Sequence, residues 1–274
     1  MALFPIHQFF SLNGNLTPNN KFVASENEGG VYEVIRIAQS VPFFWEEHIG
    51  RFFRSADIAG KVIPFQAAQI KIFISELIER NKVTEGNVLV SCKTNLKVFF
   101  IPHKYPEAEE YNKGVACGLL HAERENPNAK VFQTNVRATA NKLISEHGFY
   151  EVILIDHAGL VTEGSRSNVF FIKGEKLFTA LPNNVLLGIT REKTFECAKA
   201  INVNVLEKDI MLSEISSFDA AFLTGTSPKI LPVKQIEDIV FSTNHSILQE
   251  LIYQYDLMIN NYIKKNKSNH LLHL

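Results

Sequence analysis

Cysteine is scarce in this 274-residue sequence, and the three that occur, Cys92, Cys117 and Cys197, lie far apart. No two of them have the spacing of a zinc knuckle or a redox pair, so we expect reduced, mostly buried thiols and no bound metal. Glycine and proline are also few, at 14 and 10 residues, and there is no low-complexity block. This composition excludes a collagen-like, linker-dominated or extensively disordered chain.

Neither sign of charge is in excess, because 28 basic residues are balanced by 29 acidic ones. Such a balance gives no electrostatic attraction for duplex nucleic acid or for an anionic membrane surface. The longest apolar runs are too short to cross a bilayer, and the first ten residues lack the basic leader of an export signal. We therefore expect a cytoplasmic protein whose partners are small molecules, with neither a nucleic-acid nor a membrane partner.

The sequence does contain short β-rich runs interspersed with amphipathic helical patterns. The predicted strands cover 31–38, 88–92, 97–101, 150–156, 168–172 and 220–223, and the predicted helices cover 45–59, 66–80, 134–146, 190–200 and 245–264. These elements do not follow the regular βαβ repeat of a doubly wound sheet, so we expect an α+β fold.

A polar stretch at 118–129, which contains Pro127, has no periodicity and is typical of a connection between domains. We therefore expect two domains, a small α+β domain over 1–120 and a larger domain over 121–274.

No single motif in the sequence decides its function. There is no P-loop, GxGxxG, HExxH or GxSxG pattern, and the run from Gly164 to Ser167 lacks the second glycine of a hydrolase nucleophile elbow. Six short segments nevertheless occur in an informative order. They are GVYEV at 30–34, EHIGRF at 47–52, NAKV at 128–131, VTEGSRSNVFF at 161–171, LGITR at 187–191 and LTGTSP at 223–228.

This ordered set resembles the class IV aminotransferases, the fold type IV enzymes that depend on pyridoxal 5'-phosphate. The family includes branched-chain and D-amino acid aminotransferases and aminodeoxychorismate lyase. The resemblance covers about residues 29 to 235 and implies a smaller N-terminal α/β domain, a larger C-terminal pseudo-barrel domain that binds the cofactor, and a site at the domain interface. It also implies a homodimer.

For the cofactor lysine, the family places its Schiff-base residue about 21 positions before the glutamate of a Tyr-Glu-Ala-like strand. Here that strand is Tyr150 to Val152, and the spacing leads to Lys130. Lys130 would serve both as the covalent anchor and as a proton shuttle. The alternatives are that Lys130 is a solvated lysine on a linker, or that Lys142 carries the cofactor.

For the ring nitrogen of the cofactor, the resemblance assigns Glu163, which would keep the pyridine protonated so that the ring accepts electrons. A surface glutamate in a hairpin is the alternative. Ile189 and Thr190 fall at a predicted helix start, where free backbone amides and the helix dipole favour a phosphate. Thr190 could equally be a simple N-cap.

Two further phosphate contacts follow from the resemblance. Gly225 and Thr226 combine a small residue, which permits close backbone approach, with a hydroxyl donor. Arg51 matches the phosphate arginine of the family, with a planar fork suited to oxygen anions. Alternatively, Arg51 and Arg54 form the polar edge of an amphipathic helix.

Substrate recognition departs from the family pattern. The segment from Lys93 to His103 is short and has no arginine, so Lys97 or His103 is the candidate for binding the substrate carboxylate. Arg137 is another candidate. Tyr32 matches an active-site position and His48 is a further candidate, although either residue could simply pack in the core.

The leading hypothesis is an aminotransferase that moves an amino group between an amino acid and a 2-oxo acid through a Schiff base at Lys130. The second is a lyase of the aminodeoxychorismate lyase type, which uses the same cofactor and lysine but releases pyruvate. The third is a scaffold or binding protein that keeps the fold without turnover. The turn from Thr224 to Thr226 resembles the aminotransferase form of the second phosphate contact and favours the first hypothesis.

Overall fold

The computed structural model describes residues 3–24, 30–132 and 134–271. Contacts divide the chain into two compact units. The first unit comprises Met1–Lys104, Ala129–Phe132 and Ile259–Leu274, and the second unit comprises Tyr105–Asn128 and Gln133–Met258. The first unit is therefore assembled from three separate segments of the chain.

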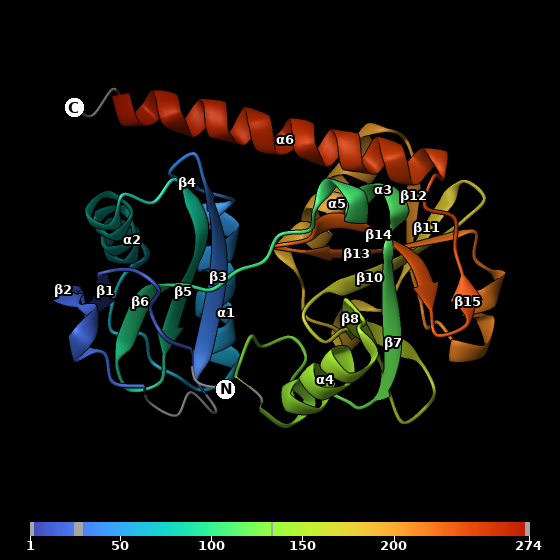
Figure 1. The fold of residues 1–274 in the computed structure, drawn as a ribbon, viewed down its shortest axis with the longest axis horizontal. Coiled ribbons are helices and arrows are strands. Elements are labelled where there is room, and N and C mark those ends of the chain that lie inside the picture. The colour runs from blue at the N-terminus through green and yellow to red at the C-terminus, as the bar shows by residue number, and fades with distance from the viewer. Residues whose placement is uncertain (1–2, 25–29, 133, 272–274) are drawn as a thin grey trace. The chain divides into compact units, whose positions relative to one another are not determined.

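An antiparallel sheet forms the body of the first unit (Figure 1). Its order among the described residues is β2 (Asn15–Pro18), β1 (Phe9–Leu12), β6 (Leu96–Ile101), β5 (Glu85–Cys92), β3 (Val31–Ala38) and β4 (Val41–Pro42). Helices α1 (Trp45–Ile58) and α2 (Ala67–Asn81) bury their apolar stripes in one core with this sheet, so both cover the same face.

The alternation of side chains along strand β3 determines which of them contact α1. Because successive side chains of a strand point to opposite faces, Val31, Glu33 and Ile35 share one face while Tyr32 lies on the other. Val31 and Ile35 belong to the core with α1 and α2, whereas Tyr32 packs in a smaller cluster with Leu89 and Phe99. Glu33 is thereby turned into the layer between β3 and α1.

A larger mixed sheet forms the second unit (Figure 1). Along the described chain its order is β12 (Asn204–Glu207), β11 (Lys176–Thr179), β10 (Asn168–Lys173), β13 (Ala220–Gly225), β14 (Lys229–Ile236), β7 (Val115–His121), β8 (Glu151–Ile155) and β9 (Val161–Gly164), with β15 (Ile239–Val240) paired to β14. The helices are α3 (Ala108–Lys113), α4 (Thr134–His147) and α5 (Ile189–Ala200).

The last helix, α6 (Ser246–Leu271), contributes residues to both units. Within the first unit, the Tyr262 hydroxyl accepts a hydrogen bond from the backbone N–H of Trp45 at 3.1 Å and donates one to Glu46 at 3.0 Å. The N-terminus of α1, which has no side-chain cap of its own, is thus held by a tyrosine 217 residues later in the chain. Short 3-10 helices occupy Asn19–Lys21, Pro182–Asn184 and Leu212–Ser217.

The predicted α+β fold class is confirmed, and the predicted strands and helices are present with shifts of up to three residues at their ends, except that the last helix continues seven residues beyond its predicted end at 264. The interpretation of 118–129 as a connection is wrong at its start, because β7 extends to His121 between the parallel strands β14 and β8. Gly118 interrupts the strand pattern in the sequence, and a Cβ there would lie 2.4 Å from the ring of Phe149, so a larger residue would require this ring to shift.

The division into domains at residue 120 stays a prediction, and the compact units have different boundaries. All three cysteines are buried and none forms a disulfide. In the described residues no helix is long and apolar enough to span a membrane, and no group of three or more His, Cys, Asp or Glu side chains is placed to hold a metal ion.

Candidate functional site

Lys130 lies on an extended segment that pairs with the start of β3. The backbone N–H of Tyr32 donates to the Lys130 carbonyl at 3.0 Å, and the N–H of Phe132 donates to the Gly30 carbonyl at 2.9 Å. The N–H of Lys130 itself donates to Ser55 Oγ on α1 at 3.0 Å. Strand pairing and α1 therefore fix the backbone of Lys130 on both sides.

The amine of Lys130 lies over an aromatic ring. Its Nζ is 4.9 Å from the centroid of the Tyr32 ring, within the range of a cation–π contact. The Phe132 ring stacks on Tyr32 with centroids 4.0 Å apart. The two predicted residues Lys130 and Tyr32 are thus brought together, and Phe132 holds the Tyr32 ring in place.

Glu33 and Arg51 form a buried ion pair between β3 and α1. Arg51 Nε donates to Oε2 at 2.8 Å and Nη2 donates to Oε1 at 2.7 Å, while Arg51 is 4% and Glu33 1% exposed. Burial alone would raise the pKa of Glu33, but the Arg51 charge, with smaller contributions from the neighbouring His48 and Lys130 side chains, outweighs it and holds the pKa well below its usual range. The carboxylate stays ionised and fixes the guanidinium plane.

His48 belongs to the same cluster. Its Nδ1 lies 3.3 Å from Glu33 Oε1, without the geometry of a good hydrogen bond. Burial lowers the pKa of His48, and the nearby carboxylate of Glu33 compensates only in part. His48 is therefore held as a neutral imidazole in the layer beside Arg51.

In the second unit, Glu163 on β9 is a buried carboxylate that accepts hydrogen bonds at both of its oxygens. Its Oε2 accepts the backbone N–H of Leu186 at 3.1 Å and lies 3.4 Å from Asn168 Nδ2. Its Oε1 accepts Arg124 Nη1 at 3.1 Å. Both carboxylate oxygens of Glu163 thus have hydrogen-bond partners. Glu163 is therefore not a solvated surface glutamate in a hairpin, which was the alternative interpretation of the sequence.

Asn168 links this acid to the N-terminus of α5. Its Nδ2 also donates to the carbonyl of Leu186 at 2.8 Å, and a Cβ built on Gly188 would lie only 2.2 Å from its Oδ1. The helix begins at the next residue, Ile189, and has no side-chain N-cap. Residues 186–188 therefore connect the Glu163 carboxylate rigidly to a helix N-terminus whose amides are not capped.

The remaining predicted phosphate residues lie in the same unit. Pairing of β10 with β13 sets Asn168 opposite Thr224, so that Gly225 and Thr226 follow directly. Thr190 is buried, and its Oγ1 lies 3.4 Å from the Tyr255 hydroxyl.

These groups fit a pyridoxal phosphate at its two charged ends. The uncapped amides at Ile189 suit the phosphate dianion, because a helix N-terminus favours negative charge. The close approach of Gly188 to Asn168 leaves no room for a side chain at the helix start. Glu163 supplies the acid that the ring nitrogen requires.

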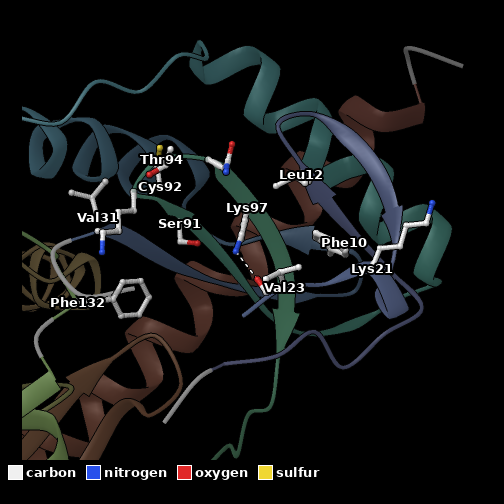
Figure 2. Close-up of a pocket in the computed structure, with 13 residues that line it drawn as sticks. Phe10, Leu12, Lys21, Val23, Val31, Ser91, Cys92, Thr94, Lys97 and Phe132 are labelled. Carbon is white, nitrogen blue, oxygen red and sulfur yellow. Dashed lines mark hydrogen bonds between the residues drawn. The ribbon is translucent and has the colours of Figure 1, made fainter. Parts of the chain in front are cut away.

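A cavity of about 450 Å³ opens in the first unit (Figure 2). Its lining residues are Phe10, Leu12, Lys21, Val23, Gly30, Val31, Ser91, Cys92, Lys93, Thr94, Asn95, Lys97 and Phe132. Within the part of the chain that the structure describes, this lining includes three lysines and no carboxylate. Figure 2 shows Lys97 reaching into it from β6, where its Nζ donates to the Val23 carbonyl at 2.8 Å.

The predicted substrate residues separate into two groups. Tyr32 and His48 lie in the Lys130 and Glu33 clusters, and Lys97 lines the cavity, to which Phe132 also contributes. His103, by contrast, is exposed after the end of β6. Arg137 is half-buried on α4 in the second unit.

Sequence reasoning missed Glu33, Arg124 and Asn168. A charged residue inside the apolar strand VYEVIRIA was a signal for Glu33, because a strand covered on both faces seldom carries an acid without a partner. Asn168 and Arg124 had no local signal, since their role depends on contacts across β9, β10 and the chain before Lys130.

Comparison with known proteins identifies the family of this chain. The model of the family described as amino-transferase class IV matches residues 30–236. The chain belongs to this family of enzymes.

Two of the similar proteins are named aminotransferases. The "Probable branched-chain-amino-acid aminotransferase" of Rickettsia bellii is 26% identical over 255 residues, covering 84% of this chain and 87% of that protein. D-alanine aminotransferase of Bacillus licheniformis is 28% identical over 224 residues, covering 76% and 79%. The crystal structure of a branched-chain aminotransferase from the thermophilic archaeon Thermoproteus uzoniensis, with norvaline, shares the fold, with a TM-score of 0.81 and 23% identity over 94% of this chain and 97% of that one.

We predict that Glu33→Gln destabilises the protein by about 3 kcal/mol at pH 7, because it leaves the buried Arg51 charge without its counterion. The folded-state pKa of Glu33 lies below its unfolded value, so its contribution to the free energy of unfolding is complete above about pH 4.5 and is lost as the pH falls further. The difference in the free energy of unfolding between the wild type and Glu33→Gln should therefore become smaller in acid. Urea denaturation at several pH values measures this difference. Glu76→Gln, on α2, is the control, and a difference independent of pH would contradict the assignment.

Proposed function

We propose that this protein is an aminotransferase that uses pyridoxal 5'-phosphate, carried by Lys130, to move an amino group between an amino acid and a 2-oxo acid. The observation that carries the proposal is the rigid connection, through Asn168 and residues 186–188, between a buried acid and an uncapped helix N-terminus. A pyridinium ring with a phosphate arm needs these two charges at its two ends. The aminotransferase names of the relatives support the reaction, and the lyase alternative is not favoured.

The proposed roles follow from the charges of the side chains. Glu163 holds the proton of the ring nitrogen, with Asn168 fixing the orientation of its carboxylate. The amides at Ile189, the Thr190 hydroxyl and the Gly225–Thr226 turn of the second unit bind the phosphate. Arg51, whose guanidinium is fixed by Glu33 within the first unit, is the further phosphate cation that the family resemblance implies. When bound, the cofactor supplies the electron sink for removal of the substrate α-proton.

Lys130 has the second role of accepting and returning that proton at Nζ. Two features support it: its backbone is fixed by β3 and by Ser55, and the Tyr32 ring restricts where the amine can lie. We also propose that the enzyme acts as a homodimer, as the resemblance implies.

Lys130→Ala should abolish the visible absorption band that lysine-bound pyridoxal phosphate gives, and with it aminotransferase activity, because no other amine takes its place. Lys142, an exposed residue of α4, is the alternative cofactor lysine. Lys142→Ala should retain both the absorption band and the aminotransferase activity. Absorption spectra before and after addition of a panel of L- and D-amino acids measure the band and its discharge. The assignment fails when the Lys142 variant loses the band and the Lys130 variant keeps it.

Among the substrate candidates, we propose that Lys97 binds the substrate carboxylate. Among the described residues that line the cavity around Lys97 there are three lysines and no carboxylate, and Phe132, two residues from Lys130, is also part of the lining. Its apolar residues, such as Leu12 and Val31, would accommodate the uncharged part of the molecule.

Lys97→Ala is expected to raise KM for the amino acid by about tenfold or more, because a charge-assisted hydrogen bond to the carboxylate is lost. His103→Ala, at an exposed position, should change KM by less than about twofold. Neither change should affect the absorption band. Steady-state kinetics test this, and an increase in KM confined to the His103 variant would show that the wrong residue has been chosen.

A further inference from the structure

Glu151, at the start of β8, is a second buried carboxylate of the larger unit and is only 3% exposed. Its Oε1 accepts the backbone N–H of Val152 at 2.9 Å and the hydroxyl of Ser165 at 2.6 Å. Its Oε2 accepts the backbone N–H of Arg166 and the hydroxyl of Ser167, both at 3.0 Å. Each oxygen of this carboxylate is thus occupied by one backbone donor and one hydroxyl.

Three of the four donors belong to the turn 165–167, which joins β9 to β10. The turn is closed by the Gly164 N–H, which donates to the Ser167 carbonyl at 2.7 Å. A Cβ built on Gly164 would lie 2.2 Å from Ser167 Oγ and 3.1 Å from Glu151 Cγ. The carboxylate and the turn are packed without space for even one methyl group.

This turn separates the two residues on which the acid end of the site depends. Glu163 comes just before Gly164, and Asn168 comes just after Ser167 and approaches the Glu163 carboxylate to 3.4 Å. Any change in the shape of the turn therefore changes the position of Glu163 relative to Asn168, and through Asn168 relative to Leu186.

We propose that Glu151 is a positioning residue of the active site, whose carboxylate clamps the turn 165–167 so that Glu163 and Asn168 are held in place for the ring nitrogen of the cofactor. The inference rests on the proposed function, and it goes further by assigning a role to a residue that would touch neither cofactor nor substrate.

Glutamine at position 151 tests the clamp without changing the volume of the side chain. A carboxylate accepts hydrogen bonds at both oxygens, whereas a glutamine amide accepts at one and donates from the other. Val152 N–H and Arg166 N–H approach opposite oxygens, so one of these two backbone donors must face the amide NH₂ in either orientation. Glu151→Gln therefore removes the hydrogen bond from one of these two backbone N–H groups.

The control is Thr179→Val, which removes a buried hydrogen bond from the Thr179 hydroxyl to the Val169 carbonyl, 2.8 Å, in the same sheet. The turn and Glu163 keep their contacts in this variant. Both variants are compared with the wild type by thermal unfolding without cofactor, by titration with pyridoxal phosphate, by the pH dependence of the visible absorption band and by kcat and KM.

We expect Glu151→Gln to weaken pyridoxal phosphate binding by about tenfold or more, to shift the pH dependence of the band and to lower kcat more than it changes KM. Thr179→Val should lower the unfolding temperature without these effects. Ser167→Ala removes one hydroxyl from the clamp and should shift the same quantities in the same direction by less. It serves as the test when the Glu151 variant does not fold.

The inference is overturned when Glu151→Gln and Ser167→Ala bind the cofactor with wild-type affinity and an unchanged pH dependence, whatever their loss of stability. That result would leave Glu151 with a structural role alone and the proposed function intact. A wild-type protein that binds no pyridoxal phosphate would instead refute the proposed function itself.

Discussion

The pairing of the segment Ala129–Phe132 with the first residues of β3 is the constraint on which the candidate chemistry depends. Two main-chain hydrogen bonds attach it to the sheet, and Ser55 of α1 adds a third. A lysine that is distant in sequence from β3 thereby lies over the Tyr32 ring. The alternation of β3 then turns the next residue, Glu33, toward α1, where it neutralises Arg51.

Three buried carboxylates of this chain, Glu33, Glu151 and Glu163, have different roles. Burying a charge is unfavourable unless it is paired or fully hydrogen-bonded, and each glutamate meets this requirement in its own way. Glu33 has a guanidinium, Glu151 has four neutral donors, and Glu163 combines an amide, a backbone N–H and the Arg124 guanidinium. The first two fix other residues, whereas Glu163 is the acid assigned to the cofactor.

Much of the fold was predictable, because strands such as 31–38 and helices such as 45–59 have strong periodicity. Strand β7 was not, since Gly118, which packs closely against the Phe149 ring, and the polar end of the strand interrupt the strand pattern. The candidate site shows the same contrast between residues that the sequence predicts and residues that depend on tertiary contacts. Lys130 was predicted from the family spacing and Glu163 from a short motif, and both assignments stay predictions, whereas the contacts of Asn168 with β9 and residues 186–188 have no counterpart in the sequence pattern.

The central claim is that Lys130 carries the cofactor, and chemical trapping tests it most directly. The protein is incubated with pyridoxal phosphate and reduced with sodium borohydride, which makes the bond to the lysine permanent, and the modified residue is located by peptide mass mapping. The account predicts a pyridoxyl group on Lys130. A modification confined to another lysine, such as Lys97 or Lys142, or no modification at all, would contradict it.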